Sequence, residues 1–327
     1  MSDARRRGGS EDGQRVAHRG DAQCGRVVAH HGVAVLVRFD DGGGERPVWL
    51  APEQRAVVGD RVRVADGRLE TLPARGVLRR MDPRGRERTI AVNLDRLFIV
   101  VAVEPREPPG YIDRGIVIAR AAGIGPTIVV NKLDLAGAET LAMRLAEIYG
   151  DGCPVLPVSA NERRGLDAIE RALAGGRLGA LVGPSGVGKS SLLNALVPDL
   201  ALEVATLNRR SGHGRHTTTT ATLHDLAGGG LLVDTAGFKD FIAVDVVPEQ
   251  AAACFPGFER ALERGCRFRD CLHRSEPDCA VRAAVDAGEI APQRLAAYAR
   301  LQAELSSTAP SAGSSRSGGG RRRKPSR

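Results

Sequence analysis

Gly183-Pro184-Ser185-Gly186-Val187-Gly188-Lys189-Ser190-Ser191 follows one apolar run and precedes another at 192–196. This order of strand, glycine-rich turn and helix predicts a phosphate-binding P-loop. The glycines let backbone N–H groups approach a phosphate chain, the Lys189 ammonium can reach the β and γ phosphates, and the Ser190 hydroxyl is placed for Mg²⁺. A chance glycine-rich turn is the alternative, and the flanking strand and helix patterns argue against it.

A second polar segment, Asn131-Lys132-Leu133-Asp134, follows an apolar strand and so lies where α/β sheets bind ligands. The Asp134 carboxylate can accept hydrogen bonds from two guanine N–H groups, a pair that adenine does not offer. The Lys132 stem can cover the base, and Ser159 with Ala160 would add a backbone contact to the guanine oxygen. Alone, the tetrapeptide could be an ordinary polar loop, but beside a P-loop it predicts GTP as the ligand.

Lysine usage supports both assignments. Only four lysines stand among the 47 Lys and Arg residues, and two of them, Lys132 and Lys189, fall in these two motifs. A compact ammonium and a planar guanidinium are not interchangeable at a ligand site. In a chain that uses Arg for nearly every cation, the two lysines therefore indicate a chemical requirement.

The segment Asp234-Thr235-Ala236-Gly237 ends another apolar strand. Its Asp234 carboxylate would hold Mg²⁺ through water, and the Gly237 N–H would contact the γ-phosphate. Residues 212–220, between the P-loop and this motif, are glycine-hinged and rich in hydroxyls, and we interpret them as the first switch. We assign Thr217 as the Mg²⁺ ligand of this switch, although four consecutive threonines leave open which one binds.

The order of these motifs is permuted relative to ordinary small GTPases, in which the P-loop comes first. Neighbouring strands hold a sheet together whatever the chain order, so a domain can be circularly permuted if its original termini lie close together. With this order, the chain from about residue 20 to 305 resembles the circularly permuted GTPases of small-ribosomal-subunit biogenesis, called RsgA or YjeQ. The second switch, 234–240, then leads directly into the C-terminal segment and can transmit the nucleotide state to it.

The resemblance and the strand pattern imply an α/β fold: a circularly permuted P-loop GTPase domain with an N-terminal OB-fold β-barrel and a C-terminal helical zinc-binding domain. The strand pattern before residue 72 would also fit an SH3-like barrel. In the GTPase domain we predict strands at 97–103, 126–130, 155–158, 178–182 and 231–233, and helices near 112–122, 138–149 and 165–173. The predicted division is 1–15 disordered, 16–75 an OB-fold RNA-binding barrel, 76–92 a basic linker, 93–240 the permuted GTPase domain, 241–305 the helical zinc-binding domain, and 306–327 a disordered basic tail.

A run of arginines follows the barrel. We interpret it as a rim that contacts RNA phosphates, with a merely solvated basic linker as the alternative. Its members are Arg75, Arg79, Arg80, Arg84, Arg86 and Arg88.

Phe238 stands where small GTPases commonly carry the glutamine that orients the attacking water, and a phenyl ring cannot do this. We therefore expect strong GTP binding and slow hydrolysis by the chain alone. The resemblance makes His216 the candidate for positioning water, because residues 214–219 match the family's Gly-Arg-His-Thr-Thr-Thr stretch. Lys189 of the P-loop is the other predicted catalytic residue. A structural role in the switch or an RNA contact is the alternative for His216.

Cys266, Cys271, His273 and Cys279 lie close together in the C-terminal segment. Three thiolates and one imidazole make a closed tetrahedral set, which is typical of one structural Zn²⁺ rather than of a catalytic metal. Unrelated buried cysteines are the alternative. An amphipathic helix is predicted to close this domain over 292–305. The remaining cysteines are expected to pack as small hydrophobic residues: Cys24, Cys153 and Cys254.

The net charge of +8 comes mostly from the end of the chain, since six cations and no acid follow residue 304. The overall charge therefore says little about the folded part. There is no N-terminal apolar signal segment, and the apolar run at 97–103 is too short to span a bilayer. We expect a cytoplasmic monomer without a membrane partner.

These observations and the resemblance together predict a GTP hydrolase of late small-subunit maturation, with GTP, Mg²⁺ and one structural Zn²⁺ as cofactors. It would bind the small ribosomal subunit and its rRNA in the GTP state, and subunit-stimulated hydrolysis would release it. An RNA-binding module that holds GTP only as a structural ligand is the alternative that Phe238 raises. A P-loop kinase would leave the guanine motifs at 131–134 and 159–160 unexplained.

Overall fold

The structure is a computed structural model, and it describes residues 22–82, 85–197, 200, 221–235, 241 and 246–308. The predicted first switch, with His216 and Thr217, lies outside these residues, as do Gly237 and Phe238. The predicted N-terminal segment 1–15 and the tail from residue 309 lie outside them too. Within the described residues, no helix has the length and apolar character needed to cross a membrane.

Five parallel strands form the centre of the molecule, in the order β10-β9-β8-β11-β13. Their sequences are near-continuous apolar runs, as expected for strands that are buried on both faces. Each predicted strand range agrees with the structure to within one residue at each end. The observed strands are β8 (Arg96–Ala102), β9 (Gly125–Asn131), β10 (Val155–Pro157), β11 (Leu178–Val182) and β13 (Leu231–Asp234).

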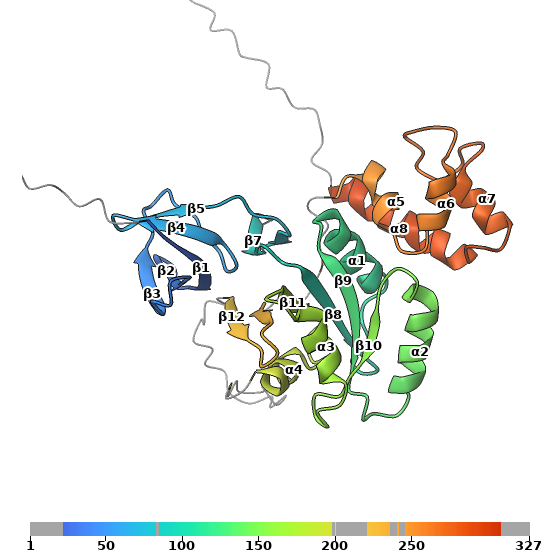
Figure 1. Cartoon of the computed structure of the whole chain (residues 1–327). Helices are drawn as coiled ribbons and strands as arrows, with labels where there is room; N and C mark the ends of the chain where they lie inside the picture. Colours follow the sequence, from blue (N-terminus) through green and yellow to red (C-terminus); the bar gives the residue numbers. More distant parts are fainter. Residues whose placement is uncertain are drawn as a thin grey trace, which may run out of the picture.

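Helices cover both faces of this sheet (Figure 1). Neighbouring residues of a strand point to opposite faces. Accordingly, Ile99 of β8 belongs to the core that includes helices α1 (Tyr111–Ala121) and α2 (Ala138–Tyr149). Phe98 belongs to the core beneath α3 (Leu166–Leu173) and α4 (Lys189–Leu196). The three predicted helices of this domain are therefore present, and the layered α/β architecture is confirmed.

The N-terminal domain is a curled antiparallel sheet in the order β3-β2-β1-β4-β5. β3 and β5, at the two ends of this order, lie next to each other, so the sheet curves towards closure. Alternating side chains, including Val27, Val37 and Val62, fill its interior. The strands are β1 (Gln23–His30), β2 (Ala34–Phe39), β3 (Glu45–Trp49), β4 (Arg61–Ala65) and β5 (Arg68–Thr71).

The barrel and the central sheet are continuous through one further strand, β12 (Thr222–Asp225). It pairs antiparallel with β13 and meets β1 where Ala29 lies opposite Thr222. The Arg38 guanidinium of β2 also donates to Asp225 at 2.7 Å. We did not predict β12 from the sequence, because its short run of mixed polarity carries little strand signal.

The segment predicted as a basic linker is an antiparallel hairpin, β6 (Leu78–Met81) with β7 (Glu87–Ala91). It folds because Leu78 and Ala91 are buried in the central core. Arg84 of the predicted phosphate-contacting rim lies outside the described residues, and three of the other five arginines are ion-paired, which reduces the positive charge they can present. The pairs are Arg75 with Asp95, Arg79 with Glu87 and Arg88 with Asp82.

The C-terminal domain packs beside α1 at the end of the molecule opposite the barrel (Figure 1). Its core is aromatic: the Phe255 ring lies 4.9 Å from Phe258 and 5.3 Å from Tyr298, measured between centroids. The predicted closing helix is confirmed as α8 (Pro292–Thr308), and it extends three residues beyond the predicted end. The shorter elements are η1 (Pro248–Gln250), α5 (Ala251–Cys254), α6 (Glu259–Arg264) and α7 (Ala280–Asp286).

Candidate nucleotide site and metal centre

The P-loop connects β11 to α4, as the sequence predicts. Its glycines are required by close packing. A Cβ at Gly183 would lie 2.5 Å from the Val100 carbonyl oxygen, and one at Gly188 would lie 2.3 Å from the Asn131 amide nitrogen. Gly188 also has φ +95°, a left-handed conformation that suits glycine at the start of the helix. The loop therefore lies against the strand that carries Asn131.

Lys189 is the first residue of α4, and its side chain turns back over the loop. The Nζ atom donates to the carbonyl oxygens of Gly183 at 2.7 Å and Pro184 at 2.9 Å. Ser185, Gly186 and Ser190 are exposed, while Val187 is buried and anchors the turn. The loop thus presents its hydroxyls and main chain to solvent beside a fixed positive charge, which is the arrangement a phosphate chain needs.

Asn131 connects the P-loop with both guanine segments. Its side chain is buried; Nδ2 donates to the Val187 carbonyl oxygen at 2.9 Å, and Oδ1 accepts from the Ala160 N–H at 3.1 Å. Sequence reasoning assigned Asn131 to the nucleotide site but missed this connecting role. Proximity of the two motifs in the fold was the missing information, and a single sequence does not contain it.

The other residues of the two predicted guanine-binding segments make their own contacts near Asn131. Lys132 has φ +62°, and its Nζ donates to the Glu104 carbonyl oxygen at 2.8 Å. Asp134 is exposed and accepts a hydrogen bond from the Ser159 hydroxyl at 2.5 Å. That hydrogen bond holds the pKa of Asp134 below its usual range, so the carboxylate is ionised and able to accept from N–H donors.

Asp234 ends β13, directly beside the P-loop strand, where it lies opposite Leu181 of β11. The next residue, Thr235, is buried and donates from Oγ1 to the Leu181 carbonyl oxygen at 2.6 Å. Burial raises the pKa of Asp234, while the charges of His224 and Lys189 oppose that rise. A carboxylate in this half-buried position gains from a neighbouring cation, which fits the predicted Mg²⁺ role. Gly237, Thr217 and His216, its predicted partners, lie outside the described residues.

The four predicted zinc ligands converge in the C-terminal domain. Their ligand atoms lie within 4.8 Å of one another. His273 Nδ1 is 3.6 Å from Cys266 Sγ, 3.5 Å from Cys271 Sγ and 3.3 Å from Cys279 Sγ. A Cys₃His donor set of this size fits a tetrahedral Zn²⁺. Burial raises the pKa of the Cys271 thiol to about 12, so metal binding there would release its proton.

The three remaining cysteines differ in how deeply they are buried. Cys153 is buried, as predicted for a small hydrophobic residue, and Cys254 is partly buried. Cys24 is exposed, so the prediction is wrong for this residue. Cys24 belongs to β1, where the alternation of the strand turns its side chain away from the barrel interior.

Known proteins are similar to this chain in sequence and in structure. The family model described as RsgA GTPase matches residues 71–243. The small ribosomal subunit biogenesis GTPase RsgA of Gemmatimonas aurantiaca is 42% identical over 262 residues, covering 77% of this chain and 85% of that protein. The protein of the same name from Pseudomonas aeruginosa PAO1 is 38% identical over 310 residues, covering 92% of this chain and 87% of that protein.

Two solved structures are also similar over most of their length. YjeQ from Thermotoga maritima has a TM-score of 0.70 and 30% identity, covering 87% of this chain and 98% of that one. YloQ, described as a circularly permuted GTPase, has a TM-score of 0.66 and 26% identity, covering 90% of this chain and 99% of that one.

Proposed function

This chain belongs to the RsgA family of circularly permuted GTPases, and we propose from its site geometry how it performs the family's reaction. It is a GTP hydrolase that acts in the maturation of the small ribosomal subunit. The main support for the nucleotide site comes from the Asn131 side chain, whose two hydrogen bonds join the P-loop to the guanine segments. The permuted chain order therefore still brings the phosphate and base segments together.

GTP and Mg²⁺ are the ligands of this family's reaction. We assign the phosphate chain to residues 183–191, with Lys189 as the charge beside it, and the guanine base to Asn131, Lys132, Asp134, Ser159 and Ala160. Support comes from the exposed loop hydroxyls and from the ionised, exposed carboxylate of Asp134. Ser190, Thr217 and Asp234 are the proposed Mg²⁺ ligands, and the Gly237 N–H the proposed γ-phosphate contact.

His216 is the proposed residue that orients the attacking water, because Phe238 cannot do so. The consequence is a slow intrinsic rate that rises when the subunit orders the first switch. Hydrolysis would then release the protein from the subunit.

One structural Zn²⁺ held by Cys266, Cys271, His273 and Cys279 would supply folding energy to the C-terminal domain. This domain is small, and two of the four proposed ligands, Cys271 and Cys279, belong to its hydrophobic core, so a bound metal would hold that core together. A tetrahedral site with four protein ligands leaves no position for a substrate, so its role is structural.

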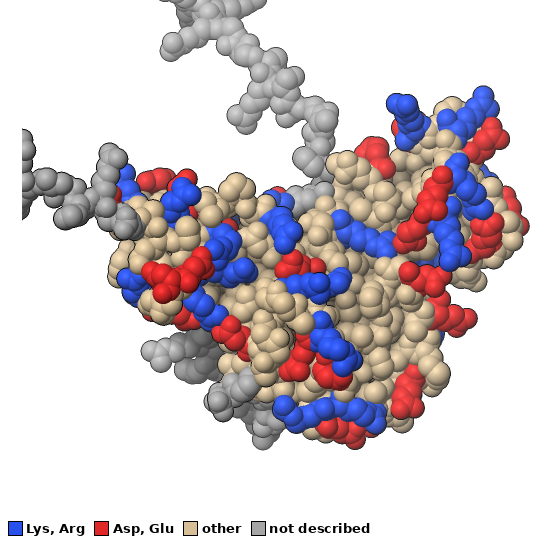
Figure 2. All heavy atoms as spheres, in the orientation of Figure 1, with Lys and Arg blue, Asp and Glu red and all other residues tan. Residues whose placement is uncertain are grey.

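The flanking domains are the proposed contacts to rRNA, with the barrel at 16–75, the hairpin region at 76–92 and the helical domain at 241–305. Arginines and acidic residues are interspersed over the face drawn in Figure 2, so that face carries no broad patch of one sign. Individual arginines at phosphates fit this surface better than one continuous basic groove. We further propose a monomer that works in the cytoplasm, with the predicted tail beyond α8 as a sequence-independent RNA contact.

Steady-state GTP hydrolysis with and without purified small subunits tests this function. We expect turnover to rise by orders of magnitude with subunits and to be lost in Lys189→Ala, whereas Arg171→Ala, at an exposed ion pair on α3, keeps it. If turnover stays flat while GTP and subunits both bind, the chain is an RNA-binding module that holds GTP as a structural ligand. Phe238 is the residue that favours this second function.

A further inference from the structure

Helix α1 packs between two cores. Tyr111, Ile112 and Ile116 belong to the core against the central sheet, whereas Val117 belongs to the core of the C-terminal domain. The helix therefore contacts the nucleotide-binding sheet on one side and the C-terminal domain on the other, as Figure 1 shows.

Phe241 packs against α1 at Gly115. The Phe241 side chain is buried, and its ring centroid is 4.8 Å from that of Tyr111. A Cβ at Gly115 would lie 2.7 Å from Phe241 Cε2 and 2.8 Å from Ile99 Cδ1. Glycine is the only residue that leaves room for the ring. In the sequence, Phe241 directly follows the predicted second switch at 234–240.

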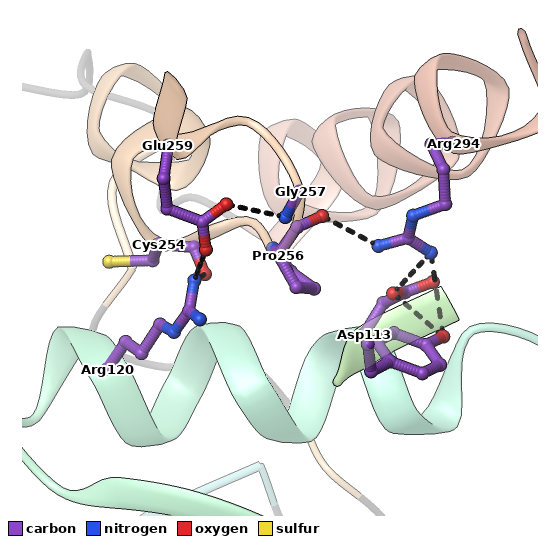
Figure 3. Close-up of polar contacts among 8 residues, drawn as sticks. Asp113, Arg120, Cys254, Pro256, Gly257, Glu259 and Arg294 are labelled. Carbon is purple, nitrogen blue, oxygen red and sulfur yellow. Dashed lines mark hydrogen bonds and ion pairs between the residues drawn. The ribbon is translucent and has the colours of Figure 1, made fainter. Parts of the chain in front are cut away.

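Charged contacts attach the C-terminal domain to the opposite side of α1 (Figure 3). Arg120 donates to Glu259 at 2.7 Å and to the Cys254 carbonyl oxygen at 3.3 Å. Arg294 donates to the buried Asp113 at 2.9 Å and to the Pro256 carbonyl oxygen at 3.0 Å. These contacts come from both ends of the helix, so the domain is held to α1 along its length. A third ion pair joins the same two elements: Arg114 with Glu304 at 3.0 Å.

We propose that α1 couples the nucleotide site to the C-terminal domain, with Phe241 as the positioning residue. A displacement of Phe241 pushes on α1 at Gly115, and the C-terminal domain moves with the helix to which it is bound. This route acts through packing, in addition to the direct chain connection from the second switch. The inference rests on the proposed function only in taking GTP and GDP as the two ligands of the site.

Hydrogen–deuterium exchange on the full zinc-loaded chain tests the coupling without ribosomes. In the wild type we expect exchange in α1, α5 and α8 to differ by at least about fivefold between a non-hydrolysable GTP analogue and GDP, the lower end of typical allosteric coupling. Gly115→Ala places a methyl group 2.7 Å from Phe241 Cε2, so the ring must shift, and the variant should reduce the difference to less than about twofold. In a helix interior this substitution would otherwise favour folding.

Gly115→Ala combined with Phe241→Leu should restore the difference, because leucine lacks the ring atoms nearest the new methyl group. Gly228→Ala is the matched control. A Cβ there would lie 3.7 Å from its nearest neighbour, Glu170 Cβ, and residue 228 is far from α1 in the sequence. The proposal is overturned if the wild type shows no nucleotide-dependent exchange in these helices, or if Gly115→Ala keeps the full difference. Nucleotide-dependent exchange without any effect of small subunits on turnover would refute the proposed function and support the coupling.

Discussion

Replacing Asn131 by alanine tests whether the phosphate and guanine segments act as one site. The variant leaves two groups without their partners, the Val187 carbonyl and the Ala160 N–H. An unsatisfied buried polar group costs about 1–3 kcal/mol, so the two together cost about 2–6 kcal/mol. If about half of this, about 1–3 kcal/mol, appears in binding, GTP affinity falls about fivefold to about 140-fold, since about 1.4 kcal/mol corresponds to a factor of ten.

The affinities for GTP and GDP should fall together, because Asn131 organises contacts to the base and to the loop rather than to the γ-phosphate. Titration with fluorescent GTP and GDP analogues measures both. Asn93→Ala is the matched control: this asparagine also makes one donor and one acceptor contact to main chain, to the Gly59 carbonyl oxygen and the Arg75 N–H, but it lies at the barrel junction. It should lower stability without changing affinity. An unchanged affinity in Asn131→Ala, or a loss confined to GTP, would refute the reasoning.

Three further predictions concern the C-terminal domain. Arg294→Ala leaves the Asp113 carboxylate buried without its ion pair and should cost about 3–5 kcal/mol in urea unfolding, whereas Arg267→Ala at an exposed pair should cost less than about 1 kcal/mol. Zinc chelation should unfold residues 246–308 first, seen as loss of helical circular dichroism, and re-addition of Zn²⁺ should restore it; retained helix after metal loss would contradict a structural metal. Burial opposes ionisation of Glu276, but main-chain N–H donors outweigh it and lower its pKa to about 2. Glu276→Gln should therefore destabilise the protein at pH 7, and the difference from wild type should shrink as the pH falls from about 4.5 towards 2; a difference that grows on acidification would contradict this.

The central sheet was predictable because its strands are short apolar runs, which in β8, β9 and β11 are almost wholly buried, and such runs stand out in sequence. The P-loop and the zinc set were predictable because their spacing reflects local chemistry. Less local features were not. The β6–β7 hairpin is stabilised by Leu78 and Ala91 against a distant core, and its arginines look like a solvated linker until the cross-strand ion pairs are seen. Gly115 was not predictable either, because the requirement for glycine there comes from the Phe241 ring, which is distant in the sequence.

The permutation gives each flanking domain an attachment near one of the two predicted switches. The barrel pairs through Ala29 with Thr222 of β12, the strand that begins directly after residues 212–220. The C-terminal domain follows the second switch and is held by α1, against which Phe241 packs. In an unpermuted order the strand that precedes the P-loop would come first in the domain, and the second switch would lead back into the sheet rather than into the C-terminal domain. Circular permutation therefore places the C-terminal domain directly after the predicted second switch, and the strand that pairs with the barrel shortly after the predicted first switch.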